Sequence, residues 1–397
     1  MQKYLFPSTL LLPASDPEKF AVIACDQFTS DAAYWQSVEE TVGDAPSSLR
    51  LILPEIYLSK DKRAILTSIR THMEQYLRDG YFTEHPDAMI YVERKLANGA
   101  VRRGIVATVD LADYDYHKGA DARIRATEET IPERIPPRVA IREQALLELS
   151  HILLLADDPA DRIIGAVAAV SDSLPLLYDF DLMQGGGHLI GRLIPSALQD
   201  EINAVLAEFE KSSPMLFAVG DGNHSLATAK ECYNAHPDSF SRYAMVELVN
   251  LHDPSLVFEP IYRIVYGMDS TLLRREMESY FGTLHAEDGQ TCLILSANGE
   301  ETLSLPPVQK LTVGSLQSFL NDLTARYPDV KLDYVHEAET VRSRSLQPDT
   351  TGFLFDSIHK NELFPAVLAD GALPRKTFSM GEGYDKRYYL EAREIRK

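Results

Sequence analysis

The chain has 397 residues, which is enough for two or three domains and for a core that needs neither disulfides nor a structural metal. Its hydrophobic content of 45% and charged content of 25% are typical of a globular protein. The net charge of −20 argues against nucleic acids and membranes as general partners, because both surfaces are anionic.

The first part of the chain alternates short apolar runs with amphipathic stretches. The pattern predicts a strand, two helices and a β-hairpin, over residues 20–25, 31–42, 60–79 and 89–111. The pair Asn98-Gly99 marks the turn of the hairpin.

An arginine- and proline-rich loop over residues 123–138 follows, and we expect a helix after it near residues 141–150. The same criteria predict strands at 152–155, 163–170, 215–219, 245–251 and 255–265, and helices at 197–211 and 226–233. Strands that alternate with helices indicate an α/β (α+β) core with a mixed sheet.

From residue 269 onward the order changes to helix, hairpin, helix, strand, helix and strand. The hairpin is predicted over residues 290–305 and the next helix over 314–327. We therefore expect two domains, a larger one over residues 1–268 and a smaller α+β domain over 269–397. An exposed apolar face on the C-terminal hairpin would also suit a homodimer.

The segment Gly220-Asp221-Gly222-Asn223-His224-Ser225 lies between a predicted strand and a predicted helix. The two glycines permit a tight turn and a close approach of backbone to a ligand. Asn223 is a favoured N-cap for a helix that begins near Ser225, which would leave the N–H groups of the first turn pointing outward. His224 can donate to a phosphoryl oxygen or move a proton, and Asp221 can accept a hydroxyl proton or bind Mg²⁺. The alternative is a turn and a cap without function, because these residue types dominate turns.

A helix start attracts anions only weakly, by about 0.3–1 kcal/mol per charge, whereas millimolar binding needs about 4 kcal/mol. The arginine loop is the candidate source of additional charge. Within it we favour Arg134 and Arg138 as ligands of phosphate or carboxylate, because guanidinium groups match both anions. The alternative is that these arginines pair with the glutamates of the same loop.

The stretch Phe217–Lys230, taken with four other segments in the same order, resembles the domain of unknown function 1015 family. The other segments are Arg125–Thr130 with Arg134 and Arg138, Leu177–Leu182 with the triple glycine and His188, Asn250–Arg263, and Leu373–Phe378. Many members have Asp-Gly-His-His-Arg where this chain has Asp221 to Ser225. The resemblance covers essentially the whole chain.

The same motif is distantly similar to that of the ParB, sulfiredoxin and free-serine kinase superfamily. The similarity implies a compact ParB/sulfiredoxin-like fold around residues 20–265, in which the motif binds nucleotide phosphates at a helix N-terminus. The chain departs from the motif at Ser225, where the superfamily has an arginine, so a fixed positive charge is missing. It also lacks the sulfiredoxin cysteine, which argues against sulfinic acid reduction.

Further candidates lie at predicted strand ends and in loops. Asp26 and Gln27 follow the first strand, where a carboxylate suits general base work or an amine ligand; a helix cap is the alternative. His188 follows three glycines and could reach a phosphoryl group. Asp181, with Asp221, could hold a metal ion, although solvent-exposed loop carboxylates are the slightly favoured interpretation.

These residues define the predicted site. The predicted catalytic groups are Asp221, His224 and Asp26; the predicted phosphate- or substrate-binding groups are Gly222, Asn223, Ser225, Arg134, Arg138, Gln27 and His188; and the predicted metal ligands are Asp221 and Asp181.

The leading functional hypothesis is a phosphotransferase acting on a small hydroxylated metabolite. Free serine or phosphoserine is favoured by the resemblance, with a nucleotide such as ATP or ADP, or pyrophosphate, as the partner and Mg²⁺ as the metal. The alternatives are a phosphatase of the phosphoserine type and a non-catalytic, nucleotide-sensing regulatory protein. Three isolated cysteines and an N-terminus without signal-peptide features predict a soluble, cytoplasmic protein.

Overall fold

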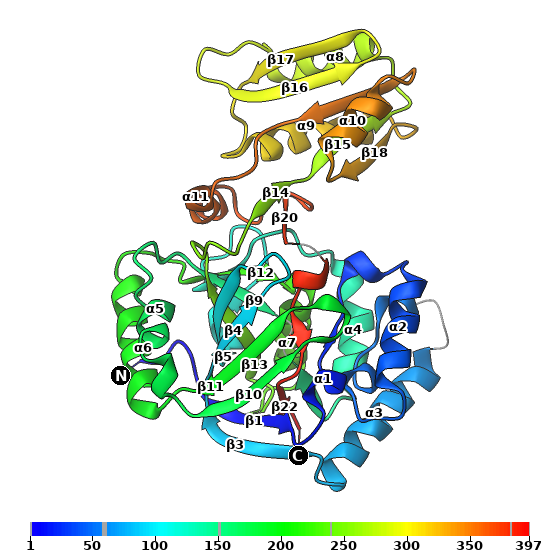
Figure 1. Cartoon of the computed structure of the whole chain (residues 1–397). Coiled ribbons are helices and arrows are strands. Elements are labelled where there is room, and N and C mark those ends of the chain that lie inside the picture. The colour runs from blue at the N-terminus through cyan, green and yellow to red at the C-terminus, as the bar shows by residue number, and fades with distance from the viewer. Residues whose placement is uncertain (1, 58–61, 150–151, 239, 382, 397) are drawn as a thin grey trace. The chain divides into compact units, whose positions relative to one another are not determined.

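The computed structural model describes residues 2–57, 62–149, 152–238, 240–381 and 383–396. It divides into two compact units (Figure 1). Unit 1 comprises Met1–Ala126, Thr130–Leu256 and Gly381–Lys397, and unit 2 comprises Thr127–Glu129 and Val257–Met380. A single boundary at residue 268 therefore does not describe the chain, because the last segment returns to unit 1.

Unit 1 is built on a nine-stranded mixed sheet in the order β10-β11-β4-β5-β13-β9-β12-β7-β6. Its strands are β4 (Ile90–Lys95), β5 (Val101–Asp110), β6 (Tyr114–Asp115), β7 (Ile124–Ala126), β9 (Leu153–Ala156), β10 (Leu176–Asp181), β11 (His188–Leu193), β12 (Phe217–Asp221) and β13 (Tyr243–Asn250). Strands β12 and β7 are parallel, as are β13 and β9, whereas β12 and β9 are antiparallel. The sheet confirms the predicted α/β class with mixed strands.

A second sheet of unit 1 joins both ends of the sequence, in the order β3-β1-β22-β8. It comprises β1 (Ser8–Pro13), β3 (Phe82–Ala88), β8 (Leu147–Leu149) and β22 (Ala392–Glu394). The short pair β2 (Val22–Ile23) and β21 (Tyr388–Tyr389) ties the same two regions together. The final residues are therefore structural parts of unit 1.

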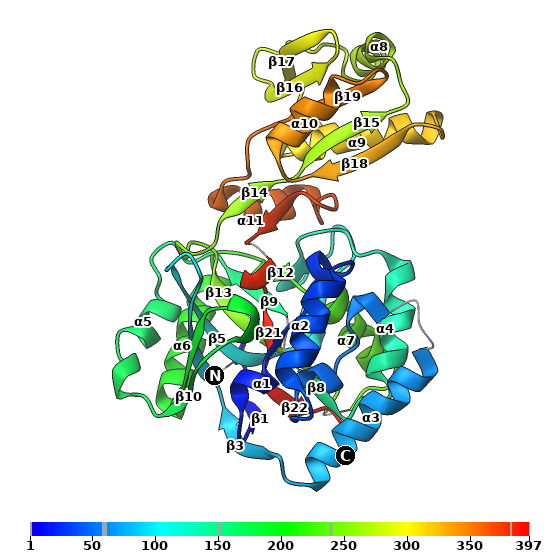
Figure 2. The same ribbon diagram turned by 45° about the vertical axis from the view of Figure 1, so that its right-hand side comes forward.

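The helices of unit 1 are α1 (Pro17–Phe20), α2 (Ala32–Val42), α3 (Lys62–Arg78), α4 (Ile135–Arg142), α5 (Ile164–Ala168), α6 (Ser196–Glu210) and α7 (Asn223–Ala235). Figures 1 and 2 show α5 and α6 on one side of the large sheet and α2 and α3 on the other. Two separate hydrophobic clusters form the core; one contains Trp35 and Met73, and the other contains Leu206 and Leu226.

Two predicted elements of unit 1 are wrong. The apolar run at 163–170 forms helix α5 instead of a strand, because a short apolar run has no periodicity that separates the two. The helix expected near 141–150 lies earlier, as α4, and Leu147–Leu149 is strand β8. Pro136 and Pro137 stand in the first turn of α4, where a missing N–H costs nothing.

Unit 2 contains a five-stranded sheet in the order β17-β16-β19-β15-β18 and the pair β14–β20. Its elements are β14 (Phe258–Pro260), β15 (Tyr262–Tyr266), α8 (Ser270–Phe281), β16 (Gln290–Ser296), β17 (Gly299–Leu305), α9 (Thr312–Arg326), β18 (Lys331–Val335), α10 (Ala338–Ser345), β19 (Thr350–Leu354), α11 (Lys360–Asp370) and β20 (Phe378–Met380). In Figures 1 and 2, α10 covers one face of this sheet and α8 and α9 cover the other.

The hairpin β16–β17 has the predicted Asn298-Gly299 turn, but its apolar side chains are not exposed. Cys292, Leu303 and Leu305 are buried within unit 2. The exposed apolar face that favoured a homodimer is therefore absent from this hairpin.

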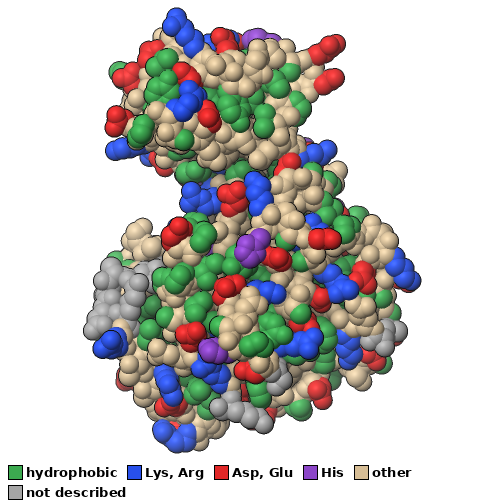
Figure 3. Space-filling model, turned by 180° about the vertical axis from the view of Figure 1, so that it is seen from behind, with side chains coloured by type: hydrophobic (Ala, Val, Ile, Leu, Met, Phe, Trp, Pro, Cys, Tyr) green, Lys and Arg blue, Asp and Glu red, His purple; other side chains and the backbone are tan. Residues whose placement is uncertain are grey.

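Acidic and basic side chains are interspersed on the visible face of each unit in Figure 3, so the negative charge of the chain is spread over that face. None of the helices in the described chain combines the length and the apolar composition that a membrane span requires.

Candidate active site

The junction between β12 and α7 is a left-handed turn at Gly222. Phe217, Ala218 and Val219 are buried in the sheet, and Asp221 ends the strand. Gly222 has φ 86° and ψ 23°, a conformation that costs a residue with a Cβ about 1–2 kcal/mol. The glycine therefore allows the chain to turn directly from the strand into the helix.

Gly222, and not Asn223, occupies the N-cap position, so the predicted cap is wrong by one residue. A glycine has no side chain to bind the first turn. Instead, Oδ1 of Asp221 accepts the N–H of Gly222 at 2.8 Å, and the Gly222 carbonyl accepts the N–H groups of Ser225 and Leu226 at 2.9 and 3.0 Å. No side chain of the cap residue therefore accepts an N–H group of the first turn. The Oδ1 atom of Asn223 is buried and has no hydrogen-bond partner among the described residues.

A lysine that sequence reasoning missed lies beside Asp221. The ammonium nitrogen of Lys386 is 3.7 Å from Oδ2 of Asp221, and the two side chains are 15% and 40% exposed. Lys386 lies far along the chain, outside every segment that resembles the family motif. Only the return of the last segment into unit 1 brings it here.

We call residues 383–391 the return segment. Its backbone is held by Arg94 of β4, whose guanidinium donates to the carbonyls of Tyr384, Asp385 and Lys386. Burial, together with the neighbouring Arg102 guanidinium, lowers the pKa of Arg94 to about 9, so Arg94 is still charged at neutral pH.

The return segment also contacts the region after β2, and Arg94 links it to the triple-glycine loop. Nε of Arg94 donates to the carbonyl of Gly186 at 2.9 Å. The thiol of Cys25 lies 3.8 Å from the carbonyl of Gly383, and the rings of Phe28 and Tyr384 are 5.2 Å apart. Arg94 thus joins the return segment to a loop that is distant in sequence.

Asp26 and Gln27 belong to this neighbourhood through the short 3-10 turn η1 (Asp26–Phe28). Gln27 is exposed, and its Oε1 atom lies 3.8 Å from the thiol of Cys25. The side chain of Asp26 lies outside the described part of the structure. Its predicted role as a base stays a prediction.

The arginine loop reaches the motif through the backbone. The N–H of Ile131 donates to Nε2 of His224 at 3.2 Å. Because it accepts this hydrogen bond, Nε2 carries no proton, and the ring proton is on Nδ1. Nδ1 is therefore the atom of His224 that could donate to a ligand.

Arg134 and Arg138 follow this contact closely along the chain. Arg134 is exposed and ends the 3-10 turn η5 (Pro132–Arg134). Arg138 is half-buried, and its Nη1 atom donates to the carbonyl of Arg134 at 3.1 Å. Both lie on or next to α4, which packs against α7. The loop is thus adjacent to the helix of the motif.

His188 and Asp181 form a separate cluster at one edge of the sheet. The imidazole of His188 lies between Asp179 and Asp181, at 2.8 Å from a carboxylate oxygen of each. These residues lie on β10 and β11, and β12 is separated from β10 by five strands in the sheet order. The structure does not bring His188 or Asp181 to Asp221 in the way that the predicted site requires.

The predicted metal ligands therefore do not fit a shared metal ion. Within the described residues, no three His, Cys, Asp or Glu side chains are grouped so that they could hold a metal. Asp181 is paired with His188, and Asp221 is adjacent to the Lys386 ammonium. A lone carboxylate next to a cation is a poor resident site for Mg²⁺, which demands octahedral coordination by several oxygen atoms.

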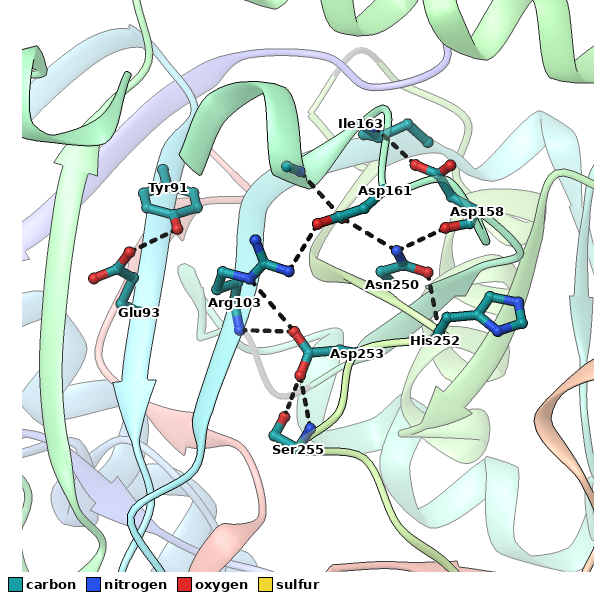
Figure 4. A network of polar contacts seen from close by, with 11 residues as sticks. Tyr91, Glu93, Arg103, Asp158, Asp161, Ile163, Asn250, His252, Asp253 and Ser255 are labelled. Carbon is teal, nitrogen blue, oxygen red and sulfur yellow. Dashed lines mark hydrogen bonds and ion pairs between the residues drawn. The ribbon is translucent and has the colours of Figure 1, made fainter. Parts of the chain in front are cut away.

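A second polar network lies where β9 and β13 end (Figure 4). Asn250 donates to the Asp158 carbonyl at 2.8 Å and to Asp161 at 3.2 Å, and Arg103 donates to Asp161 at 2.8 Å. Asp253 accepts from the N–H and the hydroxyl of Ser255. The contacts join loop to strand, which fits a structural role for the turn after Asn250.

Residues 8–334 match the sequence profile of a family described as a protein of unknown function, DUF1015. This chain belongs to the DUF1015 family. None of the curated proteins matches it.

Solved structures share only a distant likeness with this DUF1015 chain. A conserved hypothetical protein from Pyrococcus furiosus has 10% identity and a TM-score of 0.40, covering 73% of this chain and 95% of that one. A free serine kinase in complex with AMP has 9% identity and a TM-score of 0.42, covering 73% and 92%. SbnI with a C-terminal truncation, from Staphylococcus aureus, has 10% identity and a TM-score of 0.36, covering 70% and 82%. Likenesses this distant do not bear on the chemistry of the site.

Proposed function

We propose that this DUF1015 protein is a phosphotransferase that acts on a small hydroxylated metabolite, with free serine or phosphoserine as the preferred substrate. The observation that carries the proposal is the turn at Gly222. It places a partly exposed carboxylate, Asp221, directly before a helix start that carries His224, and the arginine loop contacts His224 through Ile131. A base, a proton donor and a helix start in one turn suit transfer of an anionic group.

In the proposed reaction the hydroxyl oxygen of the substrate attacks phosphorus of the donor. The new O–P bond forms as the O–P bond to the leaving group breaks, and the hydroxyl proton passes to the Asp221 carboxylate. The leaving group is the shortened nucleotide when a nucleotide is the donor, and orthophosphate when pyrophosphate is the donor. The Nδ1–H of His224 donates to an oxygen of the transferred group. Such catalysis depends mainly on positioning and electrostatics.

The choice of serine rests on the resemblance of the motif to the superfamily that includes a free-serine kinase, and the nucleotide partner, ADP or ATP, rests on the same ground. Mg²⁺ would enter as the counter-ion of the nucleotide, because the described residues do not group into a resident metal site.

The test is phosphorus NMR on the purified protein with Mg²⁺, serine or phosphoserine, and a nucleotide or pyrophosphate. We expect transfer for at least one pair, and a loss of about 10²–10⁴-fold in kcat for Asp221→Asn. Asp200→Asn, at an exposed position on α6, is the matched control and should keep the wild-type rate.

Three results would contradict the proposal. Nucleotide binding without turnover of any pair would indicate a sensor. Release of inorganic phosphate from phosphoserine without a nucleotide acceptor would indicate a phosphatase. Equal activity of Asp221→Asn and the wild type would remove Asp221 from the mechanism.

A further inference from the structure

The helix start at the candidate site contains no lysine or arginine of its own. Asn223, His224 and Ser225 form the first turn of α7, and a helix start alone attracts an anion weakly. A phosphoryl group carries two or more negative charges, so a site for it needs a fixed cation. Lys386 is the cation that the structure records beside Asp221.

The backbone carbonyls of Asp385 and Lys386 accept hydrogen bonds from two arginine side chains. Nη1 of Arg94 donates to the carbonyl of Lys386 itself at 2.6 Å and to that of Asp385 at 3.2 Å. Nη1 of Arg102, which lies opposite Arg94 on β5, donates to the Asp385 carbonyl at 2.7 Å. Both arginines are buried, so these contacts are shielded from water.

The residue that follows Lys386 is anchored as firmly. Arg387 is 2.7 Å from a carboxylate oxygen of Glu247 and 2.8 Å from one of Glu391, and all three side chains are at most 1% exposed. Tyr178 donates to Glu391 at 2.6 Å. The Cα atom of Lys386 is therefore held on both sides, while its ammonium group extends to Asp221.

Three guanidinium groups, those of Arg94, Arg102 and Arg387, lie at the return segment. The Asp385 carboxylate of the segment itself is near Arg94, and Arg387 is paired with two buried carboxylates. Nε and Nη2 of Arg102 are buried and have no hydrogen-bond partner among the described residues. An anion bound near the segment would be attracted by this incompletely hydrogen-bonded guanidinium of Arg102.

The pair between Lys386 and Asp221 is looser than the pairs beneath it. Its 3.7 Å separation exceeds the 2.7–2.9 Å that is typical of a charged hydrogen bond, and Asp221 is 40% exposed. An ammonium group has three donors, so one carboxylate leaves donors available for a further acceptor. The arrangement suits a lysine that binds a ligand oxygen without leaving its carboxylate.

We infer that Lys386 binds the phosphoryl group of the substrate at the Gly222 turn and supplies the positive charge that Ser225 does not. This inference rests on the proposed function for its ligand class, a phosphate ester or nucleotide. The return segment then becomes a part of the binding site, although it lies outside the segments that resemble the family motif. Arg94 is a positioning residue, because it acts on the ligand only through the backbone of Lys386.

The experiment measures Kd for ADP, pyrophosphate and phosphoserine by calorimetry in the wild type, Lys386→Met and Lys386→Arg. Methionine keeps most of the aliphatic side chain without the charge. We expect at least a tenfold weaker Kd in Lys386→Met and a Kd within about threefold of the wild type in Lys386→Arg. Lys230→Met removes another partly buried lysine of the same unit, one that donates to the Leu111 carbonyl, and should change Kd by less than twofold. Circular dichroism checks the fold of each variant.

A double variant separates a ligand contact from a mere effect on Asp221. If Lys386 only neutralised Asp221, its removal would have no effect once Asp221→Asn is present. We expect Lys386→Met to weaken binding at least tenfold in that background as well. An unchanged Kd in either background overturns the inference.

The two proposals fail differently. A wild type that binds phosphate compounds through Lys386 without transferring phosphate overturns the proposed function and supports the inference. A wild type that transfers phosphate, with an equally active and equally tight-binding Lys386→Met, overturns the inference and supports the function. A wild type that binds none of the three compounds overturns both.

Discussion

Unit 1 has polar clusters at opposite ends of its central strands, and they are built differently. The network around Arg103 and Asn250, at the end of β13, consists mostly of close hydrogen bonds between loop and strand (Figure 4). The cluster at the end of β12 contains a pair 3.7 Å apart with a half-exposed carboxylate. Because β12 runs antiparallel to β9, Asp221 lies beside Leu153, the first residue of β9; because β13 runs parallel to it, Asn250 lies beside Ala156, the last. The two clusters therefore lie at opposite ends of β9. The difference indicates which polar cluster holds the fold and which is open to a ligand.

The comparison gives four predictions for the free energy of unfolding. In each, a change that strongly affects stability should have little effect on the Kd of a ligand, and the reverse. Changes in closed clusters should reduce stability and leave Kd unchanged. Changes at the β12 end should have little effect on stability and a large effect on Kd.

The largest effect should come from acid acting on a closed cluster, Glu148 with Arg393 and Arg142. The carboxylate is buried, with oxygen atoms 2.7 and 2.5 Å from the two guanidiniums, which lower its pKa from 4.5 to about 2 despite burial. Its pKa is depressed by folding, so the stabilisation is present above pH 4.5 and is lost as the pH falls towards 2. We expect about 3 kcal/mol from this group. Urea unfolding at pH 2.5 and pH 6, compared between the wild type and Glu148→Gln, measures it; equal pH dependence in both would contradict it.

The next effect should come from Arg103→Leu in the network of Figure 4. The change removes the donor to Asp161 and leaves the Asp253 carboxylate, which is 1% exposed, without its nearby guanidinium. We expect a loss of about 2 kcal/mol in urea unfolding, with an unchanged Kd for nucleotides. Arg78→Leu, at an exposed position beside Asp79, is the control and should cost almost nothing. A Kd that weakens tenfold in Arg103→Leu would show that this network belongs to the binding site.

A smaller effect is expected for Gly222→Ala at the open end. The residue has φ 86°, so alanine would be strained by about 1 kcal/mol. The turn that aligns Asp221 with α7 would shift, and we expect nucleotide binding to weaken more than stability does. Gly43→Ala, at the positive φ after α2, should also reduce stability but leave binding unchanged. If both variants bind nucleotide as tightly as the wild type, the Gly222 turn is not part of the binding site.

The smallest effect on stability is expected for Asp221→Asn. A half-exposed pair of 3.7 Å contributes less than about 1 kcal/mol. The melting temperature should therefore stay close to that of the wild type while activity is lost. A variant that unfolds easily would place Asp221 among the residues that hold the fold.

Sequence patterns were sufficient for the local part of the site. The strand, the glycine turn and the helix around Asp221 follow from a buried apolar run and from residues that permit positive φ. The hairpin β4–β5 and helices α2, α3, α6 and α9 follow from the same kinds of signal. The N-cap is displaced by one residue, because Gly222 adopts the left-handed conformation at which the chain turns, so that Asn223 is already the first residue of the helix.

The non-local part could not be predicted. Nothing in the residues around Lys386 indicates that they meet Asp221, since that contact depends on the pairing of β21 and β22 with strands from the beginning of the chain. Asp181 and His188 carry the right chemistry, but strand order places them at an edge, and strand order is set by long-range packing. The sequence therefore contains more residues of suitable chemistry than the fold brings together at one site.

The return segment also constrains the order of events during synthesis. Unit 2 is encoded between two parts of unit 1, so it can fold while unit 1 still lacks β21 and β22. In a nascent chain that ends near residue 390, the return segment has not yet been fixed in unit 1, so Lys386 does not reach Asp221. The edge of β1 that pairs with β22 is also unpaired. A ribosome that stalls late would therefore release a product with a folded unit 2 but an exposed sheet edge in unit 1, which is the kind of surface that chaperones and proteases recognise.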